Sequence, residues 1–91
     1  MLSKKASEEM INELFDLIID LKSREDCKIL FEDLCTNKEI AQMAQRVRAA
    51  KLLMQNKTYN DVIKETDISS ATLSRVSRCV QFGNGYTKFL K

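Results

Sequence analysis

The chain has 91 residues, a formal net charge of +2, no proline and only two glycines. This length suggests one domain, residues 1–91, whose small core often needs a partner, a metal or a disulfide for support. No apolar run could span a membrane, and the N-terminus lacks the continuous apolar segment of a signal peptide. We therefore expect a cytoplasmic protein with no membrane contact.

Few side chains could bind a metal or perform catalysis. The sequence has no histidine and no Cys-x-x-Cys pair, and its three cysteines (Cys27, Cys35 and Cys79) are widely spaced. Such a set is a poor disulfide framework and a poor zinc site. There is no glycine-rich phosphate loop and no nucleophile with a recognisable base, so we expect neither an enzyme nor a metal cofactor.

Charge follows a gradient along the chain. Residues 1–35 carry nine acids and five bases, a net charge of −4. Residues 36–67 carry +2, and residues 68–91 carry +4 with no acid at all. A confined basic region is typical of a nucleic-acid-binding surface, although four charges can also belong to an ordinary solvated face.

The first predicted helix covers residues 7–22. Its apolar residues span an arc of about 200°, whereas a helix that covers one core needs only ~100°. The excess favours a second copy of the chain as the cover, and the alternative is burial within one monomer. The arc comprises Met10, Ile11, Leu14, Phe15, Leu17, Ile18, Ile19 and Leu21.

Helices at residues 24–35 and 37–55 complete a dimerisation and core segment, residues 7–55. Thr36 and Glu39 match a capping box, which predicts the start of the third helix. The second helix is expected to bury Cys27, Leu30, Phe31 and Leu34, with Ile29 as a further candidate. The third presents one apolar stripe: Ile40, Met43, Ala44, Val47, Ala50, Leu53 and Met54.

Residues 58–80 have the pattern of a helix-turn-helix. Thr58 and Asp61 predict the start of a fourth helix, and Thr66-Asp67-Ile68 predicts the turn. Aspartate suits that turn because it tolerates the left-handed backbone conformation better than most residues. Ser69 is a good N-cap for a fifth helix at residues 70–80.

Residues 82–91 form a C-terminal turn and short helix. The run Phe82-Gly-Asn-Gly-Tyr86 is a turn-rich break. Beyond it, Tyr86, Phe89 and Leu90 are expected to fold back onto the core or onto a partner.

The fifth predicted helix has two distinct sides. Leu73, Val76 and Val80 face the core, where they pack on Val62 and Ile68. The outward side has no acid and no bulky aliphatic residue, so it can approach base-pair edges. Arginine can donate two hydrogen bonds to guanine, hydroxyls suit bases or phosphates, and alanine can contact a thymine methyl. These outward residues are Ser70, Ala71, Ser74, Arg75 and Arg78.

Further DNA contacts are expected at both helix starts. Exposed backbone amides there favour an anion, and neighbouring lysines add positive charge. The candidates for these contacts are Lys57, Thr58, Tyr59, Asn60, Lys64, Ser69 and Thr72. The alternative is an ordinary helical hairpin with a solvated serine-rich face.

The run Thr36–Val80 resembles the DNA-binding half of the Trp repressor superfamily, and the whole chain resembles its small YerC/YecD-type branch. The resemblance rests on Gln45-Arg-Val-Arg48, Leu52-Leu53 and Ala71-Thr-Leu-Ser-Arg75. Phe82-Gly-Asn-Gly-Tyr86 is typical of that branch. The resemblance implies an all-α, intertwined homodimer of about five to six helices, in which the N-terminal helices of both chains share one core.

The resemblance also implies an amino-acid-like corepressor between the recognition helix and the dimer core. Arg46 and Arg75 fall on its two arginine positions and Thr36 on a threonine position. Cys79 replaces a serine that contacts the ligand amine, and Asp33 replaces an apolar residue, so the pocket is half matched. The alternative for Arg46 is a side chain that covers the core, while Cys79 is interpreted as a small packing residue.

Together these patterns predict a sequence-specific DNA-binding transcription regulator, acting as a repressor. It is expected to bind double-stranded DNA as a homodimer, with modulation by a small corepressor as an additional expectation. The main alternative is a helix-turn-helix used for protein interaction without direct operator binding. Salt-dependent retention on DNA separates the two.

Overall fold

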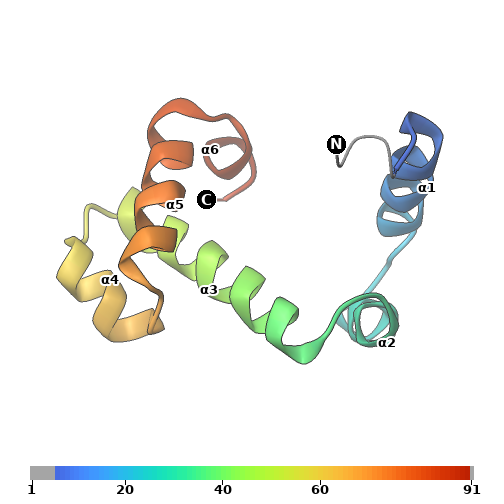
Figure 1. Cartoon of the computed structure of the whole chain (residues 1–91), viewed down its shortest axis with the longest axis horizontal. Helices are drawn as coiled ribbons and strands as arrows, with labels where there is room; N and C mark the ends of the chain where they lie inside the picture. The colour runs from blue at the N-terminus through green and yellow to red at the C-terminus, as the bar shows by residue number, and fades with distance from the viewer. Residues whose placement is uncertain (1–5, 91) are drawn as a thin grey trace. The chain divides into compact units, whose positions relative to one another are not determined.

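The computed structural model describes residues 6–90, and within them it contains six helices and no strand (Figure 1). Its helices are α1 (Glu8–Ile19), α2 (Arg24–Leu34), α3 (Asn37–Met54), α4 (Tyr59–Thr66), α5 (Ser70–Phe82) and α6 (Gly85–Phe89). The predicted all-α fold is confirmed. The N-terminal residues used for the signal-peptide prediction, and Lys91 of the C-terminal segment, lie outside the described part. None of the six helices is long and apolar enough to cross a membrane.

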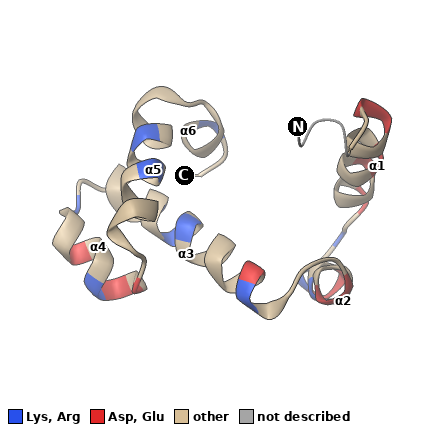
Figure 2. Ribbon diagram, viewed as in Figure 1, with Lys and Arg blue, Asp and Glu red and all other residues tan. Residues whose placement is uncertain are grey.

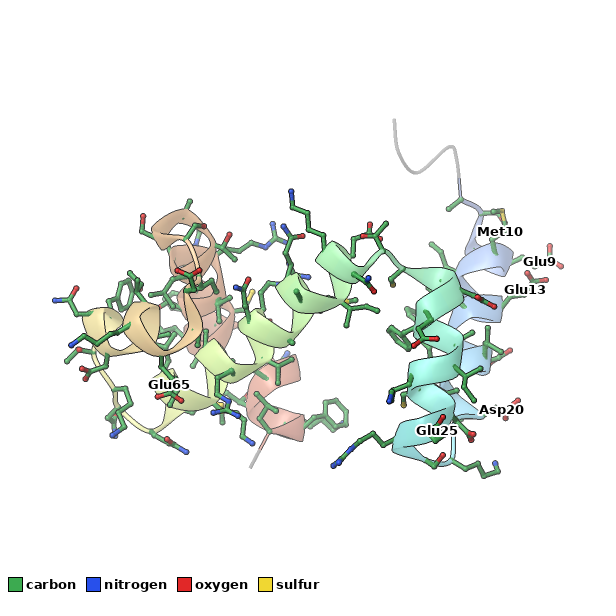
Figure 3. All side chains as sticks on the ribbon, turned by 90° about the horizontal axis from the view of Figure 1, so that it is seen from below. Glu9, Met10, Glu13, Asp20, Glu25 and Glu65 are labelled. Atoms are coloured by element: carbon green, nitrogen blue, oxygen red, sulfur yellow. The ribbon has the colours of Figure 1, made fainter. Side chains whose placement is uncertain are left out.

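The chain divides into two compact units, Met1–Cys35 and Thr36–Lys91. In the first unit, α1 begins at Ser7, whose hydroxyl accepts a hydrogen bond from the Met10 amide at 3.1 Å. The helix ends at Ile19 with Asp20 as its C-cap, three residues before the predicted end. Figure 3 shows the acidic side chains of Glu9 and Glu13 along α1.

No residue of α1 is buried within the first unit, and the alternative of a helix sheltered by its own monomer stays open beside the predicted second copy. The apolar arc is open instead: Phe15 is 54% and Ile19 is 75% exposed. A helix with so much exposed apolar surface is a candidate for contact with a further surface outside its own unit.

α2 is also less buried than its sequence predicts. Leu30 and Phe31 are half-buried, whereas Cys27, Ile29 and Leu34 are exposed. The prediction of burial is therefore wrong for Cys27 and Leu34, and also for the further candidate Ile29. The helix start is local in origin: the Asp26 amide donates to the Ser23 hydroxyl at 3.0 Å.

In the second unit, α3 is the central helix and contacts α4, α5 and α6 (Figure 1). The predicted Thr36–Glu39 capping box is present, with the Glu39 amide donating to Thr36 Oγ1 at 3.0 Å and the Thr36 amide donating to Glu39 Oε1 at 2.8 Å. The buried core comprises Ala49, Ala50, Leu52, Val62, Ile68, Leu73 and Val76.

The single apolar stripe predicted for α3 is partly wrong. Ala49 and Leu52 are buried although they lie outside that stripe, while Ala44 and Val47 of the stripe are exposed. The physical reason is that α3 has neighbours on more than one side. A helix that packs against three others buries more than one row of side chains.

α6 folds back in part as expected. Tyr86 and Leu90 pack against the core, whereas Phe89 is exposed with the Lys88 ammonium 5.4 Å from its ring centroid. Phe82, at the end of α5, is 81% exposed.

Gly83 allows the chain to leave α5, and its substitution is expected to destabilise the fold. A Cβ at Gly83 would lie 2.7 Å from the carbonyl oxygen of Cys79, which is backbone and cannot rotate away. Gly83→Ala should therefore lower the free energy of unfolding by about 1–3 kcal/mol, the usual cost of overpacking.

Gly85→Ala is the matched control, because a Cβ there meets nothing within 4 Å. It should leave stability unchanged or raise it by about 0.4–1 kcal/mol through a less flexible unfolded chain. Urea unfolding at one fixed protein concentration measures both. Equal effects of the two substitutions would contradict the steric role of Gly83.

Candidate nucleic-acid interface

The first helix of the helix-turn-helix, α4, is started by its own sequence. Thr58 Oγ1 accepts from the Asp61 amide at 3.1 Å, and Asp61 Oδ2 accepts from the Thr58 amide at 3.4 Å. This is the predicted capping box in its short, aspartate form. Val62, one residue later, is fully buried and anchors α4 on the core.

The turn after α4 has the geometry that its sequence predicts. Asp67 adopts the left-handed conformation with φ 60° and caps α4. Its amide donates to the Ile63 carbonyl at 2.8 Å, and Ile68 then enters the core. A left-handed residue at this point reverses the chain sharply, so α5 starts close to the end of α4.

Ser69 caps α5 with a pair of hydroxyl contacts. Its Oγ accepts from the Thr72 amide at 3.2 Å and lies 2.9 Å from Thr72 Oγ1, to which it donates. Both residues are among the predicted DNA contacts, but their hydroxyls already serve the helix start. Their contribution to DNA binding stays a prediction.

α5 separates its two sides as predicted. Leu73 and Val76 are buried and Val80 is half-buried, whereas the whole outward set is exposed. We call this outward set the recognition face: Ser70, Ala71, Ser74, Arg75 and Arg78.

The recognition face is basic and continues into an open hollow. In Figure 2, α5 has blue segments and no red ones, because residues 68–90 contain no acid. The hollow continues past the recognition face along α5 to Phe82 and Gly83. Sequence reasoning did not place Phe82 at this surface. The signal was available, because Phe82 lies eleven residues, or about three helical turns, after Ala71 on the same side.

The predicted phosphate contacts on α4 are exposed but not uniformly basic. Lys57, Thr58, Tyr59, Asn60 and Lys64 all face solvent. A shallow hollow brings both lysines together with the acidic side chains Asp61 and Glu65. Figure 2 shows this mixture of blue and red on α4. These lysines are therefore weaker anion sites than the arginines of α5.

The candidate effector residues do not share one hollow within this unit. Half-buried Arg46 lines a hollow with Asp67 and Ser69, next to the turn, whereas Arg75 lines the hollow along α5. Thr36 is the cap of α3 and is exposed. The half-buried position of Arg46 suits the alternative of a side chain that covers the core.

One single-residue interpretation, that of Cys79, needs correction. Cys79 is exposed beside Arg75 and Arg78, so it is not the packing residue expected from its size. Its side chain lies at the edge of the recognition face, where no other element covers it. Arg48 is exposed and forms an ion pair with Glu65 at 3.1 Å. No group of three potential metal ligands occurs in the described residues.

These features define a helix-turn-helix, the arrangement in which the second helix can enter the major groove of DNA. A family model described as Trp repressor protein matches residues 9–91. The chain therefore belongs to the Trp repressor protein family, as the resemblance predicted.

Individual relatives agree with this membership. The chain is 45% identical over 74 residues to the uncharacterized protein YerC of Bacillus subtilis, covering 81% of this chain and 71% of YerC. It is similar to the crystal structure of a Trp repressor candidate from Staphylococcus aureus, with a TM-score of 0.89, 43% identity, and coverage of 99% of this chain and 91% of the other. A TrpR-like protein from Eubacterium eligens gives a TM-score of 0.87 and 38% identity, over 93% and 89% of the two chains.

The cap at Ser69 gives a stability test that does not involve DNA. Ser69→Ala removes the acceptor of the Thr72 amide and should lower the free energy of unfolding by about 1 kcal/mol. Ser70→Ala changes the next residue, which is exposed and forms no hydrogen bond from its side chain within residues 6–90. It should leave stability nearly unchanged. Thermal unfolding without DNA measures both, and a loss for Ser70→Ala as large as that for Ser69→Ala would argue against the cap.

Proposed function

We propose that this protein is a sequence-specific transcription regulator, acting as a repressor, that binds operator DNA as a homodimer. The single observation that carries the proposal is the exposed, acid-free recognition face of α5. Small and hydroxylated side chains at its start allow close approach to base edges, and Arg75 and Arg78 can donate bidentate hydrogen bonds to guanine. The family membership supports the DNA-binding part of this proposal.

The homodimer is supported by the open apolar surfaces of the isolated chain. No residue of α1 is buried, and Val47 of α3 is 43% exposed. A second copy can cover such surfaces symmetrically, since each chain offers the other the same apolar helix. Two recognition helices related by a two-fold axis then call for a pseudo-palindromic site, with half-sites about 34–36 Å apart.

An amino-acid-like corepressor belongs to the proposal as an additional element. Within one chain, Arg46 lines the hollow next to the turn, and Arg75 lines the hollow along α5 together with Cys79. A thermal-shift screen with amino acids tests this element, because a ligand of the folded state raises its stability by mass action. The proposed location is the cytoplasm.

Substitutions on the two helices should affect DNA binding differently. Arg78→Ala and Ser74→Ala remove base contacts and should change sequence preference, by about 1–3 kcal/mol for a lost bidentate pair. Lys57→Ala and Lys64→Ala should weaken binding to all sequences similarly and flatten the salt dependence, because phosphate contacts release counterions. A gel-shift series over salt, on selected and random DNA, measures this.

Equal losses for Arg78→Ala on both kinds of DNA would remove Arg78 from the base contacts. If the unmodified protein ignored DNA at all salt concentrations, the recognition face would instead serve protein interaction.

A charged residue in the apolar arc of α1 should prevent dimerisation. Phe15→Asp places a carboxylate where the second copy is proposed to pack, and burying it without a partner is costly. Asn12→Asp adds the same charge on the polar side of α1 and should leave the dimer intact. Sedimentation equilibrium reports the mass of each variant. A monomeric native protein, or a dimeric Phe15→Asp variant, would contradict the proposed interface.

A further inference from the structure

Most polar groups in the turn between α4 and α5 form hydrogen bonds within α4 and the turn itself. Thr66 Oγ1 donates to the Val62 carbonyl at 2.7 Å and accepts from the Ile68 amide at 3.3 Å. The Asp67 amide donates to the Ile63 carbonyl at 2.8 Å. Because α4 ends at Thr66, the carbonyl of Thr66 itself has no donor within its own helix.

Gln45 of α3 supplies the missing donor. Its Nε2 lies 3.1 Å from the Thr66 carbonyl oxygen, across 21 residues of sequence, in a half-buried position. One turn further along α3, Arg48 pairs with Glu65 at 3.1 Å. Glu65 is labelled on α4 in Figure 3. Thus α3 holds the end of α4 at two successive positions.

The Arg48–Glu65 ion pair and the Gln45–Thr66 hydrogen bond differ in how firmly they hold the end of α4. The side chains of Arg48 and Glu65 are 61% and 50% exposed, and ion pairs with this exposure hold a geometry weakly. The Gln45 bond is partly shielded from water and satisfies a carbonyl that would otherwise have no protein donor. Gln45 is therefore the stronger restraint.

A directional bond is needed here because the core alone is not directional. Val62, Leu73 and Val76 stabilise the packing of α4 and α5 by apolar burial, which tolerates small rotations of a helix. A hydrogen bond weakens steeply when its angle changes. The bonded carbonyl lies four residues before Ser70, the first residue of α5. Its position therefore restrains the turn from which the recognition helix starts.

We infer that Gln45 is a positioning residue for base recognition: through the turn, it sets the orientation of the recognition face without contacting DNA. This inference rests on the proposed DNA-binding function. Base contacts demand accurate hydrogen-bond geometry, whereas long lysine side chains follow phosphates over a wider range. Loss of the Gln45 bond should therefore affect selected DNA far more than random DNA.

The test compares Gln45→Met with Gln42→Met. Methionine keeps the length of glutamine but has no donor. Gln42 lies almost one turn earlier on α3, is exposed, and forms no hydrogen bond from its side chain in residues 6–90. The dissociation constants are measured for the duplex that the unmodified protein selects from a random pool, and for a random duplex of equal length. Gln45→Met should lower the ratio of the two affinities about tenfold.

The remaining variants narrow the interpretation. Gln42→Met and Arg48→Ala should keep the ratio, and Gln45→Lys, which retains a donor with sufficient reach, should keep most of it. Amide exchange at Asp67 and Ile68 should accelerate in Gln45→Met while that of Leu73 in the core stays slow.

Each contrary result has a distinct meaning. If the unmodified protein binds both duplexes equally, the proposed function fails and the inference fails with it. If the unmodified protein discriminates and Gln45→Met discriminates equally well, only the inference is overturned. An equal loss on both duplexes, or a Gln45→Met chain that does not fold, would show a general structural role and would also overturn the inference.

Discussion

The close packing of α5 against α3 is the constraint on which the DNA-binding unit depends. Ala49 and Ala50 are both fully buried in the middle of α3, and their small side chains let neighbouring helices approach the backbone closely. Leu73 and Val76 of α5 fill the space that remains. Because these two residues must face inward, the helical period forces Ser74, Arg75 and Arg78 outward. The chemistry of the recognition face follows from a packing requirement on the opposite side of the same helix.

Local sequence was sufficient to predict the helix starts and the turn. Thr36, Thr58 and Ser69 each accept a backbone amide three residues later, and Asp67 adopts the left-handed conformation. These features depend on residues within one helical turn of one another, so a single sequence contains all the information they need. The same holds for the inward side of α5, whose period is unambiguous.

Contacts between distant residues could not be predicted in the same way. Gln45, Ala49 and Leu52 recur at helical spacing and form a second inward row on α3, but this row begins with a polar residue. An apolar pattern therefore does not reveal it. The sequence resemblance included Gln45 without giving it a role, and its partner Thr66 lies 21 residues away. The interpretation of Cys79 as a packing residue failed for a related reason, because small size alone predicts no neighbour.

Apolar contacts and polar contacts contribute differently to this fold. The second unit has its own buried core. Its hydrogen bonds lie at helix ends rather than inside that core: Thr58 and Ser69 cap helix starts, and Thr66, with Gln45 from α3, closes the end of α4. Burial supplies most of the stability, and the bonds at helix ends determine where each helix begins. In the first unit, α1 has a hydrogen bond at its start, the Ser7 cap, but no buried residue. Its helix start is thus specified within the chain, whereas the apolar burial that would stabilise it must come from outside that helix. The second unit thus orients α5 by contacts within itself, whereas α1 has a specified start but no apolar burial within the first unit.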